Sequence, residues 1–323
     1  VRRQRQMCIR DRFGGGEPGV DGAEIRIRGM GTYGDKSPIV IVDGVERDMS
    51  YLAPEEIETF TILKDASATA PYGVRGANGV IIVTTKRGKA SEKPSVNFKA
   101  SVGTNAPVKF PTYLGSADYA TLYNEAMINS NPGTDPSKLE LFTQDAINNY
   151  RMAKGDNSDG LGYNWDYFDY AFKPGIQQDY SLSIRGGSER ARYYVMANYY
   201  SQDGNYEHTD LTEHDTQARF KRYNFRANVD VDITKDFYVR VDLGARITDR
   251  HAPGTTASTV VSLCNTLPPY LPITVPENDN PDNEDYVLNN PYGMLYGDYR
   301  HRKNILGELS SCLLYTSDAA DEL

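Results

Sequence analysis

The sequence has little cysteine and no long hydrophobic run. Its 323 residues include three cysteines that are far apart and lack the spacing of a zinc site, namely Cys8, Cys264 and Cys312. They support neither a zinc site nor a disulfide framework, and we expect Cys264 to be inert. No stretch approaches the roughly 18 uninterrupted apolar residues of a membrane-spanning helix. Membrane-spanning strands remain possible, because their signal is weaker per segment.

Positive charge is also in deficit. The chain has 35 Lys and Arg against 44 Asp and Glu, which gives a formal net charge of −9. A sequence-independent nucleic-acid binder needs a basic surface, so we expect no nucleic-acid partner. Tyrosine, in contrast, is abundant, with 24 residues beside 10 Phe, and it favours strands and half-wet surfaces.

Motifs for catalysis and cofactor binding are missing. There is no GxSxG, HExxH or P-loop, and the histidines lack ligand-like spacing: His208, His214, His251 and His301. Gly29, Gly31 and Gly34 spell GxGxxG, but a strand follows where a dinucleotide site needs a helix. The acidic segment 277–298 lacks the glycine of an EF-hand. We predict no enzyme activity, no cofactor and no metal site.

The two ends differ from the rest of the chain. Residues 1–12 read VRRQRQMCIRDR and residues 311–323 read SCLLYTSDAADEL. Both resemble translated adapter sequence at the edges of assembled metagenomic fragments, and residues 1–12 lack the apolar stretch of a secretory signal. We predict that both are non-native tails outside the fold; genuine disordered termini are the alternative.

Residues 13–93 alternate short β-rich runs with glycine turns. Strands are predicted at 24–28, 39–42, 60–63 and 80–85, and single helical turns at 53–58 and 66–70. Asp43-Gly44 and Asn78-Gly79 supply residues that tolerate the positive φ of sharp turns. This pattern predicts a small α+β module.

The same module carries a specific signature, consisting of a DG turn after a strand, an LKDA element and a YGxRGANGV block. Its residues are Asp43, Gly44, Leu63, Lys64, Asp65, Ala66, Tyr72, Gly73, Arg75, Gly76, Ala77, Asn78, Gly79 and Val80. With these residues, 13–93 resembles the plug domain of the SusC/RagA family of TonB-linked outer-membrane transporters, from which Pro71 is a mild departure. The segment Gly186–Glu189, followed by Arg192-Tyr193-Tyr194, is similar to the family's first periplasmic hairpin. We call residues 13–93 the plug module.

Residues 94–310 show the alternation of membrane-spanning strands. In 224–233 the odd positions are apolar and the even positions are polar, and 237–246 repeats the pattern after a tight turn, so that charges on the polar faces could pair across the hairpin. Further strands are predicted at 96–102, 180–185 and 193–202, with another from Asn304. Short connections (186–190, 234–236) alternate with long ones (103–178, 203–222, 249–303), as in outer-membrane barrels. A soluble β-sandwich with one wet face is the alternative.

The first long connection is predicted to contain two helices. Ser116 can cap one, and Asp135-Pro136 can open the second before Gly155. Five aromatic residues follow that could stack on sugar rings, form an interfacial girdle or pack within the loop: Tyr163, Trp165, Tyr167, Phe168 and Tyr170.

Together these features predict an α+β plug module followed by antiparallel transmembrane β-barrel strands, which form an incomplete barrel. The resemblance implies import of a bulky nutrient, an oligosaccharide or a peptide, across the outer membrane of a Gram-negative bacterium. It also implies a SusD-like surface lipoprotein as partner, and contact with TonB through a part that would precede Phe13. A siderophore-type receptor and a soluble β-rich carbohydrate-binding protein are the alternatives.

Overall fold

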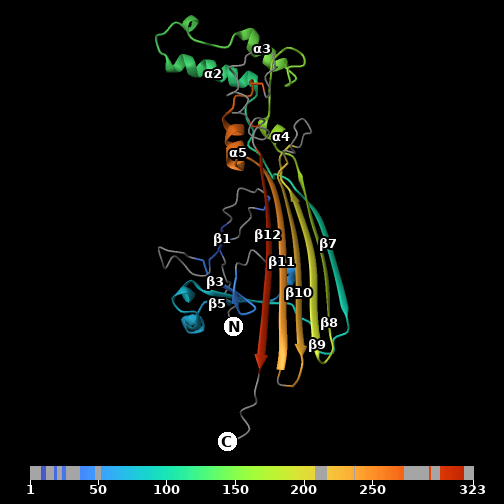
Figure 1. The fold of residues 1–323 in the computed structure, drawn as a ribbon. Coiled ribbons are helices and arrows are strands. Elements are labelled where there is room, and N and C mark those ends of the chain that lie inside the picture. Colours follow the sequence, from blue (N-terminus) through green and yellow to red (C-terminus); the bar gives the residue numbers. More distant parts are fainter. Residues whose placement is uncertain are drawn as a thin grey trace, which may run out of the picture.

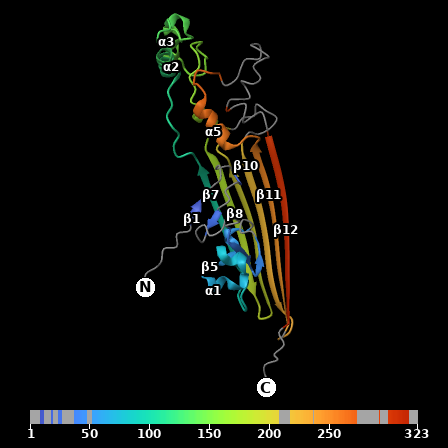
Figure 2. The same ribbon diagram turned by 90° about the vertical axis from the view of Figure 1, so that its left-hand side faces the viewer.

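In the computed structural model, a curved β-sheet holds a smaller module on one face, and helices lie beyond one end of its strands (Figures 1 and 2). The described residues are 9–11, 18–19, 24–26, 37–47, 52–207, 217–235, 237–272, 291 and 299–315, with 9–11, 24–26, 66 and 299–315 described by their backbone alone. The GxGxxG glycines, the acidic residues of segment 277–298, His208 and His214 lie outside them.

The large sheet, here called the wall, is a six-stranded antiparallel meander in which each strand pairs with its chain neighbour. Its strands are β7 (Ser95–Asn105), β8 (Gly175–Gly187), β9 (Ala191–Asp203), β10 (Arg219–Asp232), β11 (Phe237–Pro253) and β12 (Tyr299–Tyr315). The predicted strands are confirmed but are longer than the sequence suggested, and β12 begins before Asn304. It also continues through residues 311–315, which belong to the predicted tail.

The wall has an inverted distribution of polarity. On β10 the polar side chains Asn224, Arg226, Asn228 and Asp230 are all buried. The apolar side chains of the opposite face are exposed, for example Phe225 at 46% and Val96 at 65%. A soluble sandwich buries its apolar face against a second sheet, so that alternative is wrong. An exposed apolar face with a buried polar face is instead the pattern of a membrane-spanning barrel wall.

The plug module contains a mixed four-stranded sheet with the strand order β4-β3-β6-β5. Its strands are β3 (Ile39–Val42), β4 (Val45–Glu46), β5 (Ile57–Leu63) and β6 (Val80–Thr85), and its small core is formed by Val42, Ile81 and Val83. The segment also contains η2 (Pro54–Glu56), α1 (Ala66–Thr69), η3 (Ala70–Tyr72) and η4 (Val74–Asn78). Upstream, β1 (Ile9–Asp11) pairs with β2 (Glu24–Arg26), and β1 lies in the predicted N-terminal tail.

The helical turn predicted at 53–58 is wrong in its second half. Only Pro54–Glu56 forms a short 3-10 turn, and β5 begins at Ile57 instead of Phe60. The reason is tertiary, because Ile57 and Thr59 pair with Thr85 and Thr84 of β6, and this pairing overrides the local preference.

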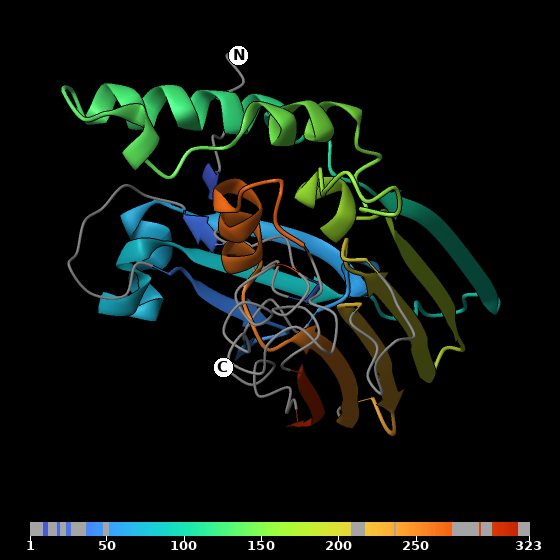
Figure 3. The same cartoon turned by 90° about the horizontal axis from the view of Figure 1, so that it is seen from above.

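The long connection after β7 contains α2 (Ser116–Ser130), η5 (Pro136–Lys138), α3 (Gln144–Met152) and α4 (Tyr167–Ala171), and α5 (Ala257–Thr266) follows β11. We call this end of the wall the helix side (Figure 3). Asp135-Pro136 opens only the 3-10 turn, whereas α3 is capped by Thr143, whose hydroxyl accepts a hydrogen bond from Ala146 N at 3.2 Å. Among the described residues, no helix is long and apolar enough to cross a membrane.

The aromatic residues of α4 pack inside the protein. Tyr167 and Phe168 are buried with Val260 and Cys264 of α5, so α4 and α5 tie two long connections together. Loop packing, one of the three predicted roles, therefore explains the rings of Tyr167 and Phe168. Burial raises the pKa of Cys264 to about 12, which keeps its thiol protonated and unreactive at neutral pH.

The polarity of the wall predicts different results for two neighbouring residues of β7. Val96→Arg places a charge on the exposed apolar face, near the middle of the apolar band, and should cost about 2–4 kcal/mol if that face contacts hydrocarbon. Asn97→Arg lies on the opposite face and should change stability little. The measurement is the free energy of unfolding of the full-length protein in phospholipid vesicles. Equal losses for the two variants would contradict the assigned faces.

Candidate functional site between the plug module and the wall

Asp43 sits in the sharp turn between β3 and β4 and contacts both the plug module and the wall. Asp43 and Gly44 have φ values of 50° and 88°, the left-handed conformation that Asp and Gly tolerate. The Asp43 carboxylate accepts hydrogen bonds from Thr85 N at 2.9 Å and from Thr85 Oγ1 at 2.6 Å. It also accepts one from Arg226 Nη2 of β10 at 3.1 Å. The DG turn of the signature thus fixes a carboxylate against the wall.

Arg226 is a buried cation held between two carboxylates of the plug module. Its side chain is 5% exposed, and Nη1 donates to Glu56 Oε2 at 3.1 Å while Nη2 donates to Asp43. Nε donates to Asn228 Oδ1 at 3.2 Å on the same strand. Burial raises the pKa of Glu56, although the Arg226 charge acts in the opposite direction. Without Arg226, the ionised form of Glu56 would therefore be strongly disfavoured.

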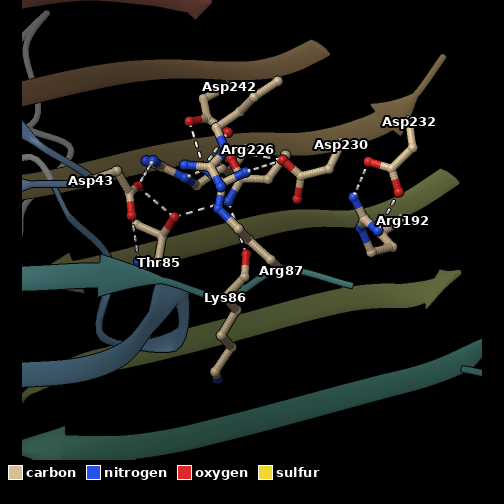
Figure 4. Close-up of polar contacts among 11 residues, drawn as sticks. Asp43, Thr85, Lys86, Arg87, Arg192, Arg226, Asp230, Asp232 and Asp242 are labelled. Atoms are coloured by element: carbon tan, nitrogen blue, oxygen red, sulfur yellow. Dashed lines mark hydrogen bonds and ion pairs between the residues drawn. The ribbon is translucent and has the colours of Figure 1, made fainter. Parts of the chain in front are cut away.

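Arg87, just after β6, makes the reverse arrangement, in which a cation of the plug module meets carboxylates of the wall (Figure 4). Its Nη2 donates to both oxygens of Asp242 at 2.7 and 2.6 Å, and Nη1 donates to Asp230 at 3.0 Å. Burial alone would lower the pKa of Arg87, but the carboxylates outweigh it and raise the pKa. Asp230 also accepts from Arg240 Nε at 3.0 Å, which confirms the predicted pairing across the β10–β11 hairpin.

Neutral side chains complete the contact. Asn228 Nδ2 donates to Thr85 Oγ1 and to Lys86 O, both at 2.9 Å. Tyr194 of β9 is 1% exposed, packs against Ala53 and donates its hydroxyl to Glu55 O at 3.3 Å. These groups of the plug module and of the wall therefore satisfy one another in the buried part of the contact.

The connection from the plug module to the wall passes close to the β8–β9 hairpin. A Cβ atom on Gly88 would lie 2.3 Å from Gly186 O, so only glycine fits at position 88. Gly187 N donates to Glu92 O at 2.9 Å, and Arg185 Nε lies 3.0 Å from Glu92. The hairpin glycines noted in the sequence thus anchor the end of the plug module.

Most of the signature shapes the plug module itself. The residues from Leu63 to Ala66 and from Tyr72 to Val80 form the turns that join β5 to β6, on the side away from the wall (Figures 1 and 3). Arg75 pairs with Glu46, and the two side chains are 71% and 49% exposed. Asp43 is the signature residue whose side chain binds Arg226 of the wall.

Sequence reasoning singled out neither Glu56 nor Arg87 and assigned no partner to Arg226. A signal was present in β10, where each inward position from Asn224 to Asp230 carries a side chain that can form hydrogen bonds. Such a face must find polar partners when it is buried. The described residues contain no cluster of three His, Cys, Asp or Glu side chains that could hold a metal.

The chain is similar in sequence to known TonB-dependent receptors. A family model described as TonB-dependent Receptor Plug Domain matches residues 9–80. TonB-dependent receptor P3 of Formosa agariphila is 34% identical over 236 residues, which are 72% of this chain and 20% of that receptor. TonB-dependent receptor SusC of Bacteroides thetaiotaomicron is 33% identical over 200 residues, 58% of this chain and 17% of SusC. The chain therefore spans about a fifth of the length of these relatives.

Solved structures agree with the sequence relatives. The RagAB peptide importer in its closed-closed state superposes with a TM-score of 0.63 at 25% identity, covering 80% of this chain and 30% of that one. The open-open state of the same importer gives a TM-score of 0.57 at 27% identity, covering 73% of this chain and 26% of that one.

The geometry predicts that Arg87 contributes far more to the stability of the protein than Arg75 does. Arg87→Met leaves Asp242 buried without its cation and should weaken the full-length receptor by about 3–5 kcal/mol. Arg75→Met removes an exposed pair and should cost no more than about 1 kcal/mol. Unfolding in urea measures the loss, and protease sensitivity of the plug module shows where it occurs.

A double-mutant cycle tests the partner assignment. Asp242→Asn combined with Arg87→Met should recover part of the loss, with a coupling of about 0.5–3 kcal/mol. Strict additivity of the two changes would show that Arg87 acts without Asp242.

Proposed function

The chain belongs to the SusC/RagA type of TonB-dependent receptors, and we propose that the full-length protein imports a bulky polar nutrient, an oligosaccharide or a peptide, across the outer membrane. The observation that carries the proposal is the inverted wall, with its exposed apolar face and its polar face covered by the plug module. A module that fills the hollow side of a membrane barrel blocks passage, so import requires the module to move. By the resemblance, the energy comes through TonB.

The inward face of the wall favours a polar cargo. On the helix side of Arg226 it carries Asn224 and, directly opposite on β9, Asn198, both of which are buried in the resting arrangement. The next inward row pairs Arg222 with Tyr200, and the Arg222 guanidinium lies 5.0 Å from the centre of the Tyr200 ring. Amide, guanidinium and phenol groups form hydrogen bonds with sugar hydroxyls and with peptide groups. These groups support either an oligosaccharide or a peptide as the proposed cargo.

A SusD-like surface lipoprotein is the proposed partner. Two observations support it: the likeness to SusC, and the likeness to the RagAB peptide importer. The helix side of the wall, where α2 to α5 form a structured rim, is the end at which such a partner would bind.

A reversible cross-link tests whether the plug module moves during import. Thr85→Cys with Asn228→Cys joins the plug module to β10 at a place where the native side chains are 2.9 Å apart. The oxidised full-length receptor should lose uptake, and dithiothreitol should restore it. Thr59→Cys with Thr84→Cys is the control, because the two residues face each other across β5 and β6 within the plug module, and their cross-link leaves the module free to move. Unchanged uptake with the Thr85–Asn228 disulfide formed would refute a moving plug.

Deletion of the receptor gene tests the cargo class. The deletion strain should lose growth on one class of oligosaccharide or peptide as sole nutrient, and the tagged receptor should co-purify a SusD-like lipoprotein from the outer membrane. Growth loss only under iron limitation, with no lipoprotein partner, would favour the siderophore-type alternative instead.

A further inference from the structure

The exposed apolar face of the wall contains a depression centred on Ala197. Across the strands, one outward row runs Phe98, Leu182, Ala197, Phe225 and Ala245, each directly opposite the next. The small side chain of Ala197 between Leu182 and Phe225 leaves a hollow of about 360 Å³. Its floor is β9, and its sides are the large side chains of β8 and β10.

Three tyrosines close the helix side of the depression. The next outward row places Tyr180, Tyr199 and Tyr223 opposite one another. Their rings touch in sequence, with centroid distances of 6.3 Å for Tyr180–Tyr199 and 5.0 Å for Tyr199–Tyr223. Tyrosine has an apolar ring and a polar hydroxyl, and it gathers at the level of lipid headgroups in membrane proteins. This row therefore marks the boundary between hydrocarbon and the polar interface.

Beyond the tyrosines the outward face becomes charged. The next row places Lys221 of β10 opposite Asp249 of β11. In the row after it, Arg219 Nε lies 3.1 Å from Asp203 Oδ1 in an ion pair. Along the strand direction the surface thus changes from an apolar hollow to phenols and then to charges. This order matches an amphiphile with a hydrocarbon tail and a polar head.

We propose that this depression binds one acyl chain of a membrane lipid, with the polar end of the lipid at the tyrosine row. The inference rests on the proposed membrane placement, because the depression is continuous with the face that would contact hydrocarbon. Neighbouring strands are about 4.7–4.9 Å apart, so the gap over β9 between the side chains of β8 and β10 has the width of a single chain. An empty hollow would forfeit the dispersion contacts of its lining, and a chain lying in it restores them.

Retention of a lipid by the purified full-length receptor tests the proposal. The receptor is reconstituted in nanodiscs of palmitoyl-oleoyl phosphatidylethanolamine, released into mild detergent and examined by native mass spectrometry. Wild type should retain a phospholipid adduct. Ala197→Phe fills the hollow and should lose it. Ala227→Phe is the matched control, because Ala227 faces outward on β10 in the next row toward the hairpin turns and does not line the depression.

The outcomes separate the alternatives. Equal retention by wild type and Ala197→Phe, or no adduct on wild type, overturns the proposal. A wild-type dimer that Ala197→Phe converts to monomers without any lipid loss also overturns it, because a second receptor copy would then fill the hollow. If Ala197→Phe fails to assemble, the smaller Ala197→Leu takes its place, with reduced retention expected and unchanged retention against the proposal. A receptor absent from the membrane fraction would defeat the proposed function itself.

Discussion

Burial of the polar face of the wall is the constraint on which the rest of the structure depends. A buried cation such as Arg226 is costly unless carboxylates surround it, and those carboxylates, Asp43 and Glu56, belong to a different part of the chain. Arg87 reverses the signs, since the plug module supplies the cation and the wall supplies Asp230 and Asp242. Neither part could bury these groups alone. The position of the plug module against the wall is thus fixed by charge and hydrogen-bond complementarity.

The polar character of this contact suits the proposed function, in which the plug module has to leave its place. Apolar surfaces that separate in water lose the full benefit of burial, whereas separated charges and amides are hydrated again. The apolar part of the contact is small, with Ala53 against Tyr194 and Met196. The contact therefore fixes the position of the module. When the contact separates, hydration of its polar groups largely offsets the free energy that is lost. Removal of one partner alone is different, because the other charge then stays buried and unpaired.

The sequence predicted those features that depend on local pattern. The strict alternation in 224–233 predicted the strand and its two faces, and Asp43-Gly44 predicted the turn. It did not predict that β5 starts at Ile57 or that Thr143 caps α3, because pairing with Thr85 and competition between nearby caps decide these ends. The sequence also did not predict the partners of Arg226, because they lie 183 and 170 residues away along the chain. The sequence pattern predicts which face of the strand a side chain lies on. The tertiary structure determines which group that side chain contacts.

The two groups of contacts differ in their distance from the anchor of the plug module. Arg87 directly precedes Gly88 and the segment whose Glu92 is bonded to Gly187 of β8, so Arg87 stays near the wall as long as that segment is attached. Asp43 and Glu56 lie far upstream and are held at the wall through Arg226. A displacement that starts from the upstream end therefore separates Arg226 from its two carboxylates first. Arg87 then remains close to Asp230 and Asp242 of the wall. Because it does, the module can return to the same position.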